Sequence, residues 1–571
     1  MKFLRLIDLI AVLAPVMLPA VLTSAQSDLG ARANQPTVSL PTQGSSAGST
    51  VRLDPPEQKA QLHFAPAVAY DSGASEADSV ALADLNGDGK LDAVVANWCQ
   101  SAGQFSCEGY GEVAVLIGNG DGTFQSPVRY STGAYFANSV AVGDVNGDGT
   151  PDLVVANYCL SIQPSCGGDG AISVLLGNGD GTFQTAATYN SGGSYAYSVA
   201  VADVNGDGIL DLAVSNTGPV GANNGSVGVL LGNGDGTFRT AASYSSGGDI
   251  AASVAIGDVN GDGIRDLVVA NYGGADGCGD CGAGVLLGNG DGTFRPAAIY
   301  NSGGGSTYSV SAWDLRGDGI LDLVAASRSS DDEGNRLRAG VGVLLGNGDG
   351  TFQPTASYLA VGLQYISYPA VGWGIDSLAV ADINGDGVPD LVIVEQCRSL
   401  EHYTNCVGTG QVNVMLGNGD GTFQAPITYG SGGYEGSSIA IGDVNGDGRP
   451  DLVLTNACGS TCSGPDGSVA VLLNTTSYAT KSALTTSPNP SQVNQMVTLT
   501  ATMASTPSIP NGEAVTFYNG STNLGTGKTT NGVATLTTSF SKAKTYTIKA
   551  DYPDDAFHKK SSGTVKQVVN P

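Results

Sequence analysis

Basic residues and histidines are scarce in this chain. Its 571 residues include 24 Lys and Arg against 52 Asp and Glu, which gives a formal net charge of −28. Nucleic-acid binding requires a basic surface, so this acidity argues against it. The three histidines, His63, His402 and His558, fall in separate segments, and a metalloprotease helix motif is absent. No catalytic constellation emerges, and we expect no enzymatic activity.

Long apolar runs are missing after the N-terminus, so we expect no transmembrane segment. Residues 1–25 have the pattern of a secretory signal: Lys2 and Arg5, an apolar stretch through Leu22, then small residues up to Ala25. Residues 26–60 are rich in Ser, Pro, Thr and Gln, which is typical of a flexible linker. The sequence therefore predicts a secreted or cell-surface protein, which we expect to be monomeric.

Glycine is abundant, with 84 residues, and charged residues make up only 13% of the chain. Together with 41% apolar content, this composition indicates a turn-rich all-β protein. Within it, the pattern Asp-x-Asn-Gly-Asp-Gly-x-x-Asp returns seven times, at intervals of 55 to 68 residues. The copies begin at Asp84, Asp144, Asp203, Asp258, Asp314, Asp382 and Asp443. Acids at positions 1, 5 and 9 and an amide at position 3 are oxygen donors that suit Ca²⁺.

Four short strands surround each acidic loop. In the third copy they are 198–202, 211–215, 226–231 and 237–244, separated by Gly-rich turns. Four-stranded repeats of this kind are typical of propeller blades, so residues 61–475 are predicted to form a seven-bladed β-propeller. The last copy lacks its outer strand, and 63–70 looks like the outer strand 124–130. We therefore expect the N-terminal strand to close the ring.

The acidic loops stop near the C-terminus. After a linker at 476–481, residues 482–571 contain alternating strands at 496–501, 513–518, 533–538 and 545–551. Short alternating strands with Gly and Asn turns suit a small immunoglobulin-like β-sandwich. The predicted fold is thus all-β throughout, a propeller followed by a sandwich.

The repeats resemble a known family. The segment Val145-Asn-Gly-Asp-Gly149 with Gly177-Asn-Gly-Asp-Gly-Thr-Phe183 is similar to the FG-GAP/VCBS repeats of secreted bacterial proteins, which are related to the calcium-binding blades of integrin α subunits. The C-terminal part, with Gly512-Glu-Ala-Val-Thr-Phe517, looks like bacterial Ig-like domains. Neither family has a single function, so the resemblance implies a fold without implying an activity.

The resemblance implies a ligand set for each loop: the side chains at positions 1, 3, 5 and 9 and the carbonyl at position 7. The implied residues are Asp84, Asn86, Asp88, Lys90 and Asp92; Asp144, Asn146, Asp148, Thr150 and Asp152; Asp203, Asn205, Asp207, Ile209 and Asp211; Asp258, Asn260, Asp262, Ile264 and Asp266; Asp382, Asn384, Asp386, Val388 and Asp390; and Asp443, Asn445, Asp447, Arg449 and Asp451. About six Ca²⁺ sites are expected.

The fifth loop departs from the pattern because Arg316 stands where Asn is expected, among Asp314, Asp318 and Asp322. A guanidinium can pair with those carboxylates in place of a metal, so we expect a weak or empty site there. The tripeptide Arg316-Gly317-Asp318 also matches an integrin ligand. We expect Asp318 to turn inward, which argues against adhesion through it.

Ten cysteines fall in five local pairs, each between the second and third strands of its repeat. The pairs are Cys99/Cys107, Cys159/Cys166, Cys278/Cys281, Cys397/Cys406 and Cys458/Cys462. The even count, the signal sequence and the repeated placement predict disulfides. Cys278-Gly-Asp-Cys281 alone also permits a redox or zinc site.

The loops at the end opposite the acidic loops carry aromatic residues, which are candidates for ligand contacts. They are Trp98, Tyr158, Tyr272, Tyr195, Tyr308, Tyr365, Tyr368, Trp373 and Tyr434. Packing between blades explains such rings equally well. The sequence thus predicts an extracellular binding or adhesion module for glycan or protein ligands. A dedicated lectin and a polysaccharide lyase or hydrolase remain open alternatives, since Tyr or Arg can act as a base.

Overall fold

The computed structural model describes residues 62–103, 106–161, 169–217, 225–272, 282–304, 306–330, 336–359, 366–367, 373–397, 410–458, 466–505 and 508–571. The predicted signal (1–25) and linker (26–60) lie outside these residues. The described chain consists of strands and turns without a helix, which confirms the all-β fold. It divides into two compact bodies, His63–Thr475 and Thr476–Pro571. No described helix is available to cross a membrane.

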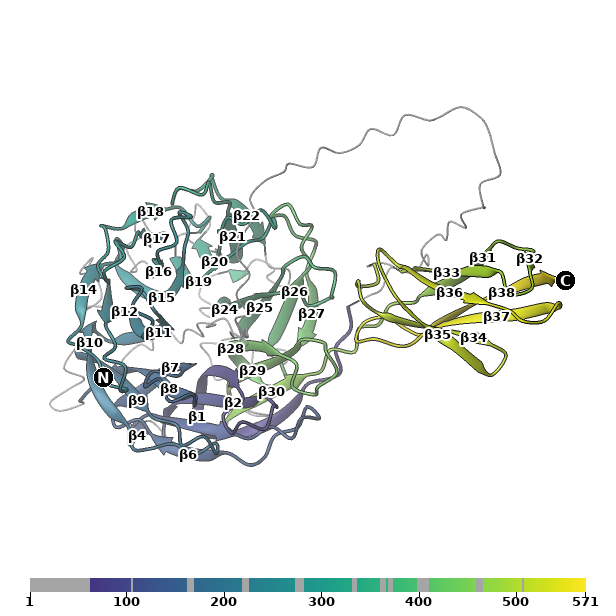
Figure 1. The fold of residues 1–571 in the computed structure, drawn as a ribbon. Helices are drawn as coiled ribbons and strands as arrows, with labels where there is room; N and C mark the ends of the chain where they lie inside the picture. Colours follow the sequence, from purple (N-terminus) through teal and green to yellow (C-terminus); the bar gives the residue numbers. More distant parts are fainter. Residues whose placement is uncertain are drawn as a thin grey trace. The chain divides into compact units, whose positions relative to one another are not determined.

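Antiparallel four-stranded groups make up the first body, and each group corresponds to one repeat unit. Figure 1 shows them arranged in a ring, with the first strand of each group facing the centre and the fourth at the rim. Units 2 to 4 are β7 (Tyr135–Gly143), β8 (Asp152–Cys159), β9 (Asp169–Leu175) and β10 (Ala187–Ser194); β11 (Ala196–Ala202), β12 (Asp211–Asn216), β13 (Ser226–Leu230) and β14 (Ala242–Ser245); and β15 (Ile250–Gly257), β16 (Asp266–Tyr272), β17 (Ala283–Leu286) and β18 (Ala298–Tyr300).

Units 5 and 6 have the same strand order. They are β19 (Ser306–Trp313), β20 (Asp322–Ser330), β21 (Arg336–Leu344) and β22 (Ala356–Leu359), with β23 (Ile366–Ser367) added to β21; and β24 (Trp373–Ala381), β25 (Asp390–Cys397), β26 (Gln411–Met415) and β27 (Ile427–Gly430). Trp373, a predicted ligand contact, is described only as the backbone that begins β24.

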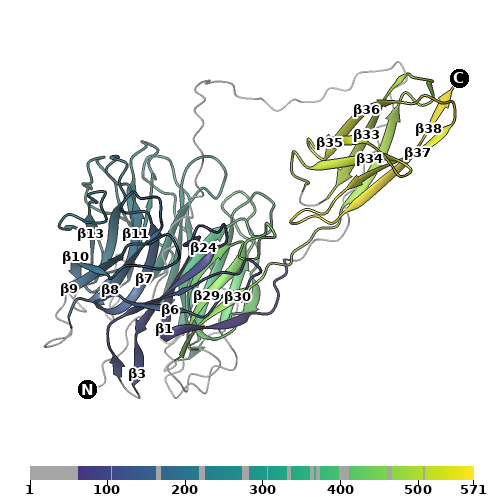
Figure 2. The ribbon, with the colours of Figure 1, turned by 60° about the horizontal axis from the view of Figure 1, so that its bottom comes forward.

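Units 1 and 7 share one long strand, β1 (Val68–Ala83), and so form a single seven-stranded sheet. Unit 1 also contains β2 (Asp92–Cys99), β5 (Glu112–Leu116) and β6 (Val128–Ser131), with the hairpin β3 (Ser101–Gly103) and β4 (Ser106–Glu108) inserted. Unit 7 contains β28 (Tyr434–Gly442), β29 (Asp451–Cys458) and β30 (Asp466–Leu472). The first part of β1 pairs with β30 and its second part with β2. Figures 1 and 2 show the purple β1 beside the green β30.

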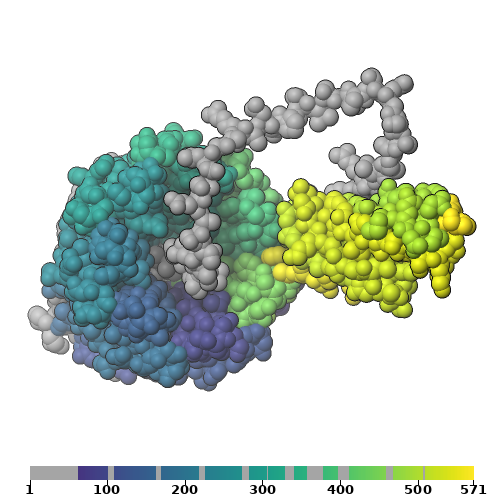
Figure 3. Space-filling model, viewed as in Figure 1, coloured from purple at the N-terminus to yellow at the C-terminus, as the bar shows by residue number. Residues whose placement is uncertain are grey.

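The hydrophobic core of this body lies between neighbouring units. Val94 and Val113 of unit 1 belong to the same buried cluster as Val140, Leu153 and Val155 of unit 2. Second strands such as β8 are buried on both faces, which explains the apolar run 153–156 within β8. In the space-filling view, the atoms of successive units abut one another around the ring (Figure 3).

The Gly-Asn-Gly-Asp-Gly-Thr-Phe turns connect the third and fourth strands and also reach the preceding unit. In the third unit, Gly232 bridges Phe238, and the fourth strand begins only at Ala242, later than the predicted 237. In the first unit, the Gly122 amide donates a hydrogen bond to the Val444 carbonyl of the seventh, at 3.1 Å. Gly122 has a φ of +83°, which an L-residue adopts only with strain. These turns therefore have a structural role, since they join strands within a unit and hold neighbouring units together.

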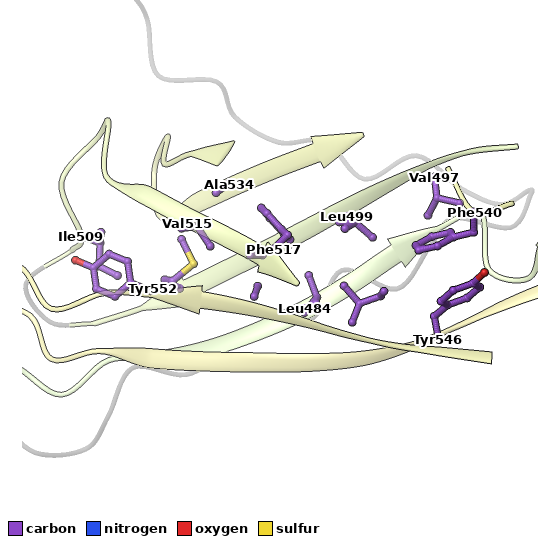
Figure 4. Packing of buried hydrophobic residues seen from close by; sticks show 14 of the residues in the cluster. Leu484, Val497, Leu499, Ile509, Val515, Phe517, Ala534, Phe540, Tyr546 and Tyr552 are labelled. Carbon is purple, nitrogen blue, oxygen red and sulfur yellow. The ribbon is translucent and has the colours of Figure 1, made fainter. Parts of the chain in front are cut away.

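The second body is a two-sheet sandwich. One sheet holds β31 (Lys481–Ser487), β33 (Met496–Ala504) and β36 (Val533–Ser539); the other holds β32 (Ser491–Gln492), β38 (Ser561–Asn570), β37 (Thr545–Tyr552), β34 (Ala514–Asn519) and β35 (Thr522–Lys528). Figure 4 shows apolar side chains from both sheets, including Leu499, Phe517 and Tyr552, meeting between them.

Part of the predicted linker 476–481 is integrated into this second body. Tyr478 is buried and forms a β-bridge with His558. Its amide donates a hydrogen bond to the Phe557 carbonyl, and Lys481 already begins β31. The free connection is therefore shorter than the sequence indicated.

Candidate metal loops and aromatic face

All seven acidic loops connect the first strand of a unit to the second, and they share one set of hydrogen bonds. In loop 4, both carboxylate oxygens of Asp258 accept main-chain amides, from Asp262 at 3.2 Å and from Gly263 at 2.8 Å. The glycine amide at position 6 makes the same bond in every loop, at 2.7 to 2.8 Å. The Asp at position 1 thus sets the turn.

The Asp at position 9 lies at the start of the second strand and is fully buried in each unit. In loop 4, Asp266 accepts the amide of Val259 at 3.0 Å and that of Gly288, in the turn after the third strand, at 2.8 Å. Burial, reinforced by the neighbouring loop carboxylates, raises the pKa of Asp152 and Asp266 to about 6 and of Asp390 and Asp451 to about 7. A carboxylate here lacks solvent and favours a nearby cation.

The Asp at position 5 always receives a side-chain donor on one oxygen. The Asn at position 3 provides it in loops 2, 3, 4 and 6, where the amide nitrogen lies 2.8 to 3.0 Å from that oxygen. Lys90 and Arg449 provide it in loops 1 and 7, at 3.3 and 2.5 Å. The resemblance implied a metal-ligand role only for the main-chain carbonyl at position 7. In these two loops the position-7 side chain also pairs with the position-5 Asp.

The loop donors are those that a hard divalent cation prefers: carboxylates, an amide oxygen and a carbonyl. In the structure their side chains are turned toward main-chain amides. Within the described parts of the chain, no three Asp, Glu, His or Cys side chains are grouped closely enough to hold a metal ion. The donor chemistry fits calcium, and binding requires the carboxylates to turn toward the ion, so calcium at these loops stays a prediction.

The fifth loop holds a cation of its own. The Arg316 guanidinium donates to both oxygens of Asp322, at 2.8 and 3.2 Å, and lies 3.1 Å from Asp318. It also donates to the Gly346 carbonyl at 2.9 Å. The expectation that Asp318 turns inward is wrong, since its side chain is 38% exposed. The ion pair nevertheless closes the Arg316-Gly317-Asp318 tripeptide on itself, which is unsuited to an adhesion ligand.

At the opposite end of the strands, units 1 to 3 carry a continuous cluster of aromatic rings. Trp98 stacks on Phe136 with centroids 4.9 Å apart, and Tyr158 stacks on Tyr195 at 4.5 Å. Trp98 and Tyr158 link the two pairs at 5.9 Å. The remaining members are Tyr110, Tyr135 and Tyr197, of which Tyr197 is buried and supports the other rings from below. We call these seven residues the aromatic cluster.

Two members of the aromatic cluster have strained backbones. Phe136 has a φ of +63° and Tyr195 a φ of +55°, in the left-handed region that bulky L-residues rarely adopt. Both precede a register shift in the first strand of their unit. The same left-handed residue precedes the same shift at Glu76 in unit 1 and at Glu435 in unit 7, so this backbone belongs to the repeat and positions the two rings.

Three predicted contact residues, Trp98, Tyr158 and Tyr195, meet in this cluster, and the others do not. Tyr272 contacts Tyr308 in a separate pair, with centroids 5.0 Å apart, and Tyr308 is buried and thus unsuited to touching a ligand. Tyr434 makes no described ring contact. Tyr365, Tyr368 and the side chain of Trp373 lie outside the described residues.

Sequence reasoning missed Tyr110, which is 46% exposed and lies at the edge of the cluster. It sits in the loop between Cys107 and the third strand of unit 1. Its position three residues after Cys107, in the same loop as a predicted disulfide, could have identified it as a candidate contact residue.

The predicted disulfides are described only in part. Cys99 and Cys159 are buried at the ends of β2 and β8, and the described residues contain no free cysteine. One pair was predicted across the loop after the second strand in each of five units, but the structure does not describe both side chains of any pair. Those described as backbone alone are Cys107, Cys397 and Cys458; those that lie outside the described residues altogether are Cys166, Cys278, Cys281, Cys406 and Cys462. The five pairings, and the redox or zinc alternative at Cys278 and Cys281, therefore stay predictions.

Comparison with known proteins identifies both bodies. The FG-GAP-like repeat family matches residues 102–155, 160–214, 220–269, 258–325, 314–393 and 404–454, and the FG-GAP repeat matches 136–175. The bacterial Ig-like domain (group 3) matches 484–570. These matches confirm the predicted resemblances.

Individual relatives are more distant. Phosphatidylinositol-glycan-specific phospholipase D of Bos taurus is 29% identical over 192 residues, which cover 31% of this chain and 22% of the relative. BBS1N, solved in complex with ARL6DN, is 12% identical with a TM-score of 0.41, covering 72% of this chain and 96% of that one. The exotype rhamnogalacturonan lyase YesX is 15% identical with a TM-score of 0.41, covering 72% and 75%. The chain spans about a fifth of the length of the phospholipase.

Proposed function

Because the chain belongs to the FG-GAP-like repeat family and ends in a bacterial Ig-like domain, we propose that it is an extracellular binding protein. Its repeat units form a closed seven-bladed scaffold, and the Ig-like domain acts as a spacer. The fold alone permits many activities, so the proposal depends on the surface that the scaffold presents. That surface is the aromatic cluster over units 1 to 3.

The main support for this proposal is that the aromatic cluster is confined to some of the repeat units. Trp98 and Tyr158 directly follow a buried Asn on the second strand of units 1 and 2. The residues at this position in units 3, 4 and 7 are Thr217, Tyr272 and Ala457, and the ring of Tyr272 pairs with Tyr308 apart from the aromatic cluster. A purely structural requirement of the blade would recur in every unit. The rings are instead gathered over three neighbouring units, as expected for a ligand contact added to a repeated scaffold.

The chemistry of the cluster favours a neutral ligand with apolar faces and hydroxyl groups, such as a glycan. Tyr and Trp rings offer a flat apolar face beside a polar group, which suits sugar rings. Arg129, on the outer strand of unit 1, is engaged by Glu112 at 2.7 Å and reaches the Gln100 carbonyl. The cluster therefore lacks an obvious cation for an acidic ligand among the described side chains.

Calcium has a structural role in this proposal. Ions bound at six acidic loops would fix the first and second strands of six units at the strand ends opposite the aromatic cluster. The ligand then contacts the cluster alone, and calcium acts on binding only by keeping the scaffold folded.

A glycan and polysaccharide screen on the secreted protein tests the proposal, with product analysis of every ligand bound. We expect binding without cleavage, and at least a tenfold loss of affinity in Phe136→Ala. Tyr272→Ala is the matched control, because Tyr272 follows the buried Asn of unit 4 outside the cluster. Equal affinity of the two variants for the bound ligand would contradict a site at the cluster, and product formation would favour the lyase or hydrolase alternative.

A further inference from the structure

The fifth acidic loop keeps the main-chain geometry of its neighbours although its sequence departs from theirs. The Asp318 and Gly319 amides donate to the Asp314 carboxylate at 3.1 and 2.8 Å. The corresponding distances in loop 4 are 3.2 and 2.8 Å. The glycine at position 6 has a φ of +82° in loop 5 and +84° in loop 4. Replacing Asn by Arg has therefore not unfolded the turn.

The position-9 carboxylate also keeps its main-chain partners. Asp322 accepts the Leu315 amide at 3.2 Å and the Gly346 amide at 2.8 Å, as Asp266 accepts two amides in loop 4. The Arg316 guanidinium adds to these bonds and displaces none of them. Its pair with Asp322 is partly shielded, since the Arg side chain is 20% exposed and the Asp side chain 0%.

Arg316 differs from the other cations near these loops in what it contacts. Lys90 and Arg449 pair with the position-5 acid. Arg316 pairs with the position-5 acid Asp318 and with both oxygens of the position-9 acid Asp322. It therefore lies between the two carboxylates that a metal would have to bridge, whereas the described contacts of Lys90 and Arg449 leave the position-9 acid to its amides.

We propose that Arg316 is a built-in cation that keeps the fifth loop folded without a divalent metal, so that the chain binds one divalent cation fewer than it has acidic loops. A planar guanidinium matches a carboxylate with two parallel hydrogen bonds, and its charge is permanent at any physiological pH. Two cations cannot share this position, because their charges repel and the guanidinium already takes the carboxylate lone pairs.

The fifth unit is then the part of the ring that is insensitive to calcium withdrawal. This consequence rests on the proposed calcium binding at the other six loops. The stabilising role of Arg316 does not depend on calcium, because it follows from the contacts of the side chain. Calcium binding and the role of Arg316 can therefore be tested separately.

Native mass spectrometry with Ca²⁺ as the probe measures the number of ions per chain in three proteins: wild type, Arg316→Asn and Asn260→Arg. Arg316→Asn restores the residue of the other six loops and is expected to bind one ion more than wild type. Asn260→Arg transfers the guanidinium into loop 4 and is expected to bind one ion fewer. An unchanged count in both variants, with ions bound to wild type, would overturn the proposal.

Thermal unfolding in chelator provides the second readout. Without metal, Arg316→Asn leaves the carboxylates of loop 5 without a cation, so its melting temperature is expected to fall below that of wild type. Asn260→Arg is expected to raise it. If wild type binds no calcium, the calcium proposal fails, and this chelator comparison still decides the role of Arg316: equal melting temperatures of wild type and Arg316→Asn would refute it.

Discussion

Phe64 packs edge-to-face against Tyr429, with ring centroids 5.1 Å apart and ring planes at 79°. Within the ring, the same contact is made by the outer-strand Tyr of one unit and the turn Phe of the next, as in Tyr130 and Phe183. The seventh unit has no such turn of its own. Phe64, from the start of the ring, supplies the missing side chain.

Replacing this ring tests how much the closure contributes to stability. Phe64 is buried, so Phe64→Ala is expected to lower the free energy of unfolding by about 3 kcal/mol. Urea denaturation measures the change. Phe124→Ala, at the corresponding position of unit 1, is the matched control and is expected to cost a similar amount. A loss below about 1 kcal/mol at Phe64 alone would show that the closing contact is dispensable.

Removal of calcium is expected to destabilise the repeat body. If each proposed site binds Ca²⁺ with a dissociation constant ten to a hundred times below the free concentration, binding contributes about 1.4 to 2.7 kcal/mol per site. The melting temperature in chelator should therefore fall markedly, and added Ca²⁺ should restore it. Identical melting curves with and without chelator would exclude the calcium assignment.

The left-handed backbone of Phe136 allows two substitutions that both remove the ring but differ in their expected effect on stability. At a φ of +63°, glycine is unstrained, whereas alanine keeps the Cβ that makes this conformation unfavourable. Phe136→Gly is expected to be more stable than Phe136→Ala by about 1 kcal/mol, although both lack the ring. Chemical denaturation of the two variants checks this, and the reverse order would mean that the left-handed backbone relaxes when the ring is removed.

Glu395 predicts a pH dependence. It occupies the position on the second strand of unit 6 where units 1 to 4 and 7 have Asn, and neither carboxyl oxygen has a hydrogen-bond partner among the described residues. Burial raises the pKa of Glu395 from 4.5 to about 7, and the nearby Asn413 amide offsets this only in part, because its nitrogen is not placed to donate a regular hydrogen bond to the carboxyl group. The folded protein therefore holds this proton more tightly than the unfolded chain does.

Stability from the protonated Glu395 is complete below about pH 4 and is lost as the pH rises through about 7. The total loss is about 3 kcal/mol at most, from the size of the pKa shift. Glu395→Gln keeps the size of the side chain without the charge, so its advantage over wild type should grow between pH 5 and pH 8. Thermal melts across this range measure it, and parallel profiles would show that Glu395 stays solvated or finds a partner.

The predicted disulfides have a direct test. All ten cysteines of the secreted protein should be protected from alkylation until a reductant is added, in five pairs that are adjacent in the sequence. Mass spectrometry after alkylation counts the free thiols, and peptides that join Cys159 to Cys166, Cys397 to Cys406 and Cys458 to Cys462 would establish the pairing. Ten labelled cysteines without reductant would refute the disulfide interpretation.

Local patterns made the strands predictable, and long-range contacts limited what could be foreseen. In the sandwich, the predicted strands at 496–501 and 545–551 correspond to β33 and β37, because alternating apolar residues indicate one buried face. The strand β35, Thr522–Lys528, was missed, since its Thr, Asn and Gly residues carry no such alternation. It forms because β34 offers it a partner through a short turn.

The acidic loops show the same division. Their positions follow from the repeated motif alone. The motif does not predict that Asp92 also accepts a hydrogen bond from the Gly118 amide, because Gly118 lies 26 residues further along the chain. The aromatic cluster was likewise visible only as a set of candidate rings. Which rings meet depends on the pairing of neighbouring units and on a left-handed residue that four units share, where Phe136 and Tyr195 stand in units 2 and 3 and Glu76 and Glu435 in units 1 and 7.

The two ends of the repeat body meet at one point. The Thr475 amide donates to the His63 carbonyl at 2.8 Å, and the His63 ring lies 2.6 Å from the Thr475 hydroxyl. The strands β1 and β30 are antiparallel, so the chain enters and leaves the repeat body at the same end of this pair. A force that pulls the segment before His63 away from the Ig-like domain would act on this junction first. It would then separate the two strands one hydrogen bond at a time. The other units would carry none of that force. A protein anchored through both ends would therefore yield at a single seam while the rest of its structure stayed mechanically unloaded.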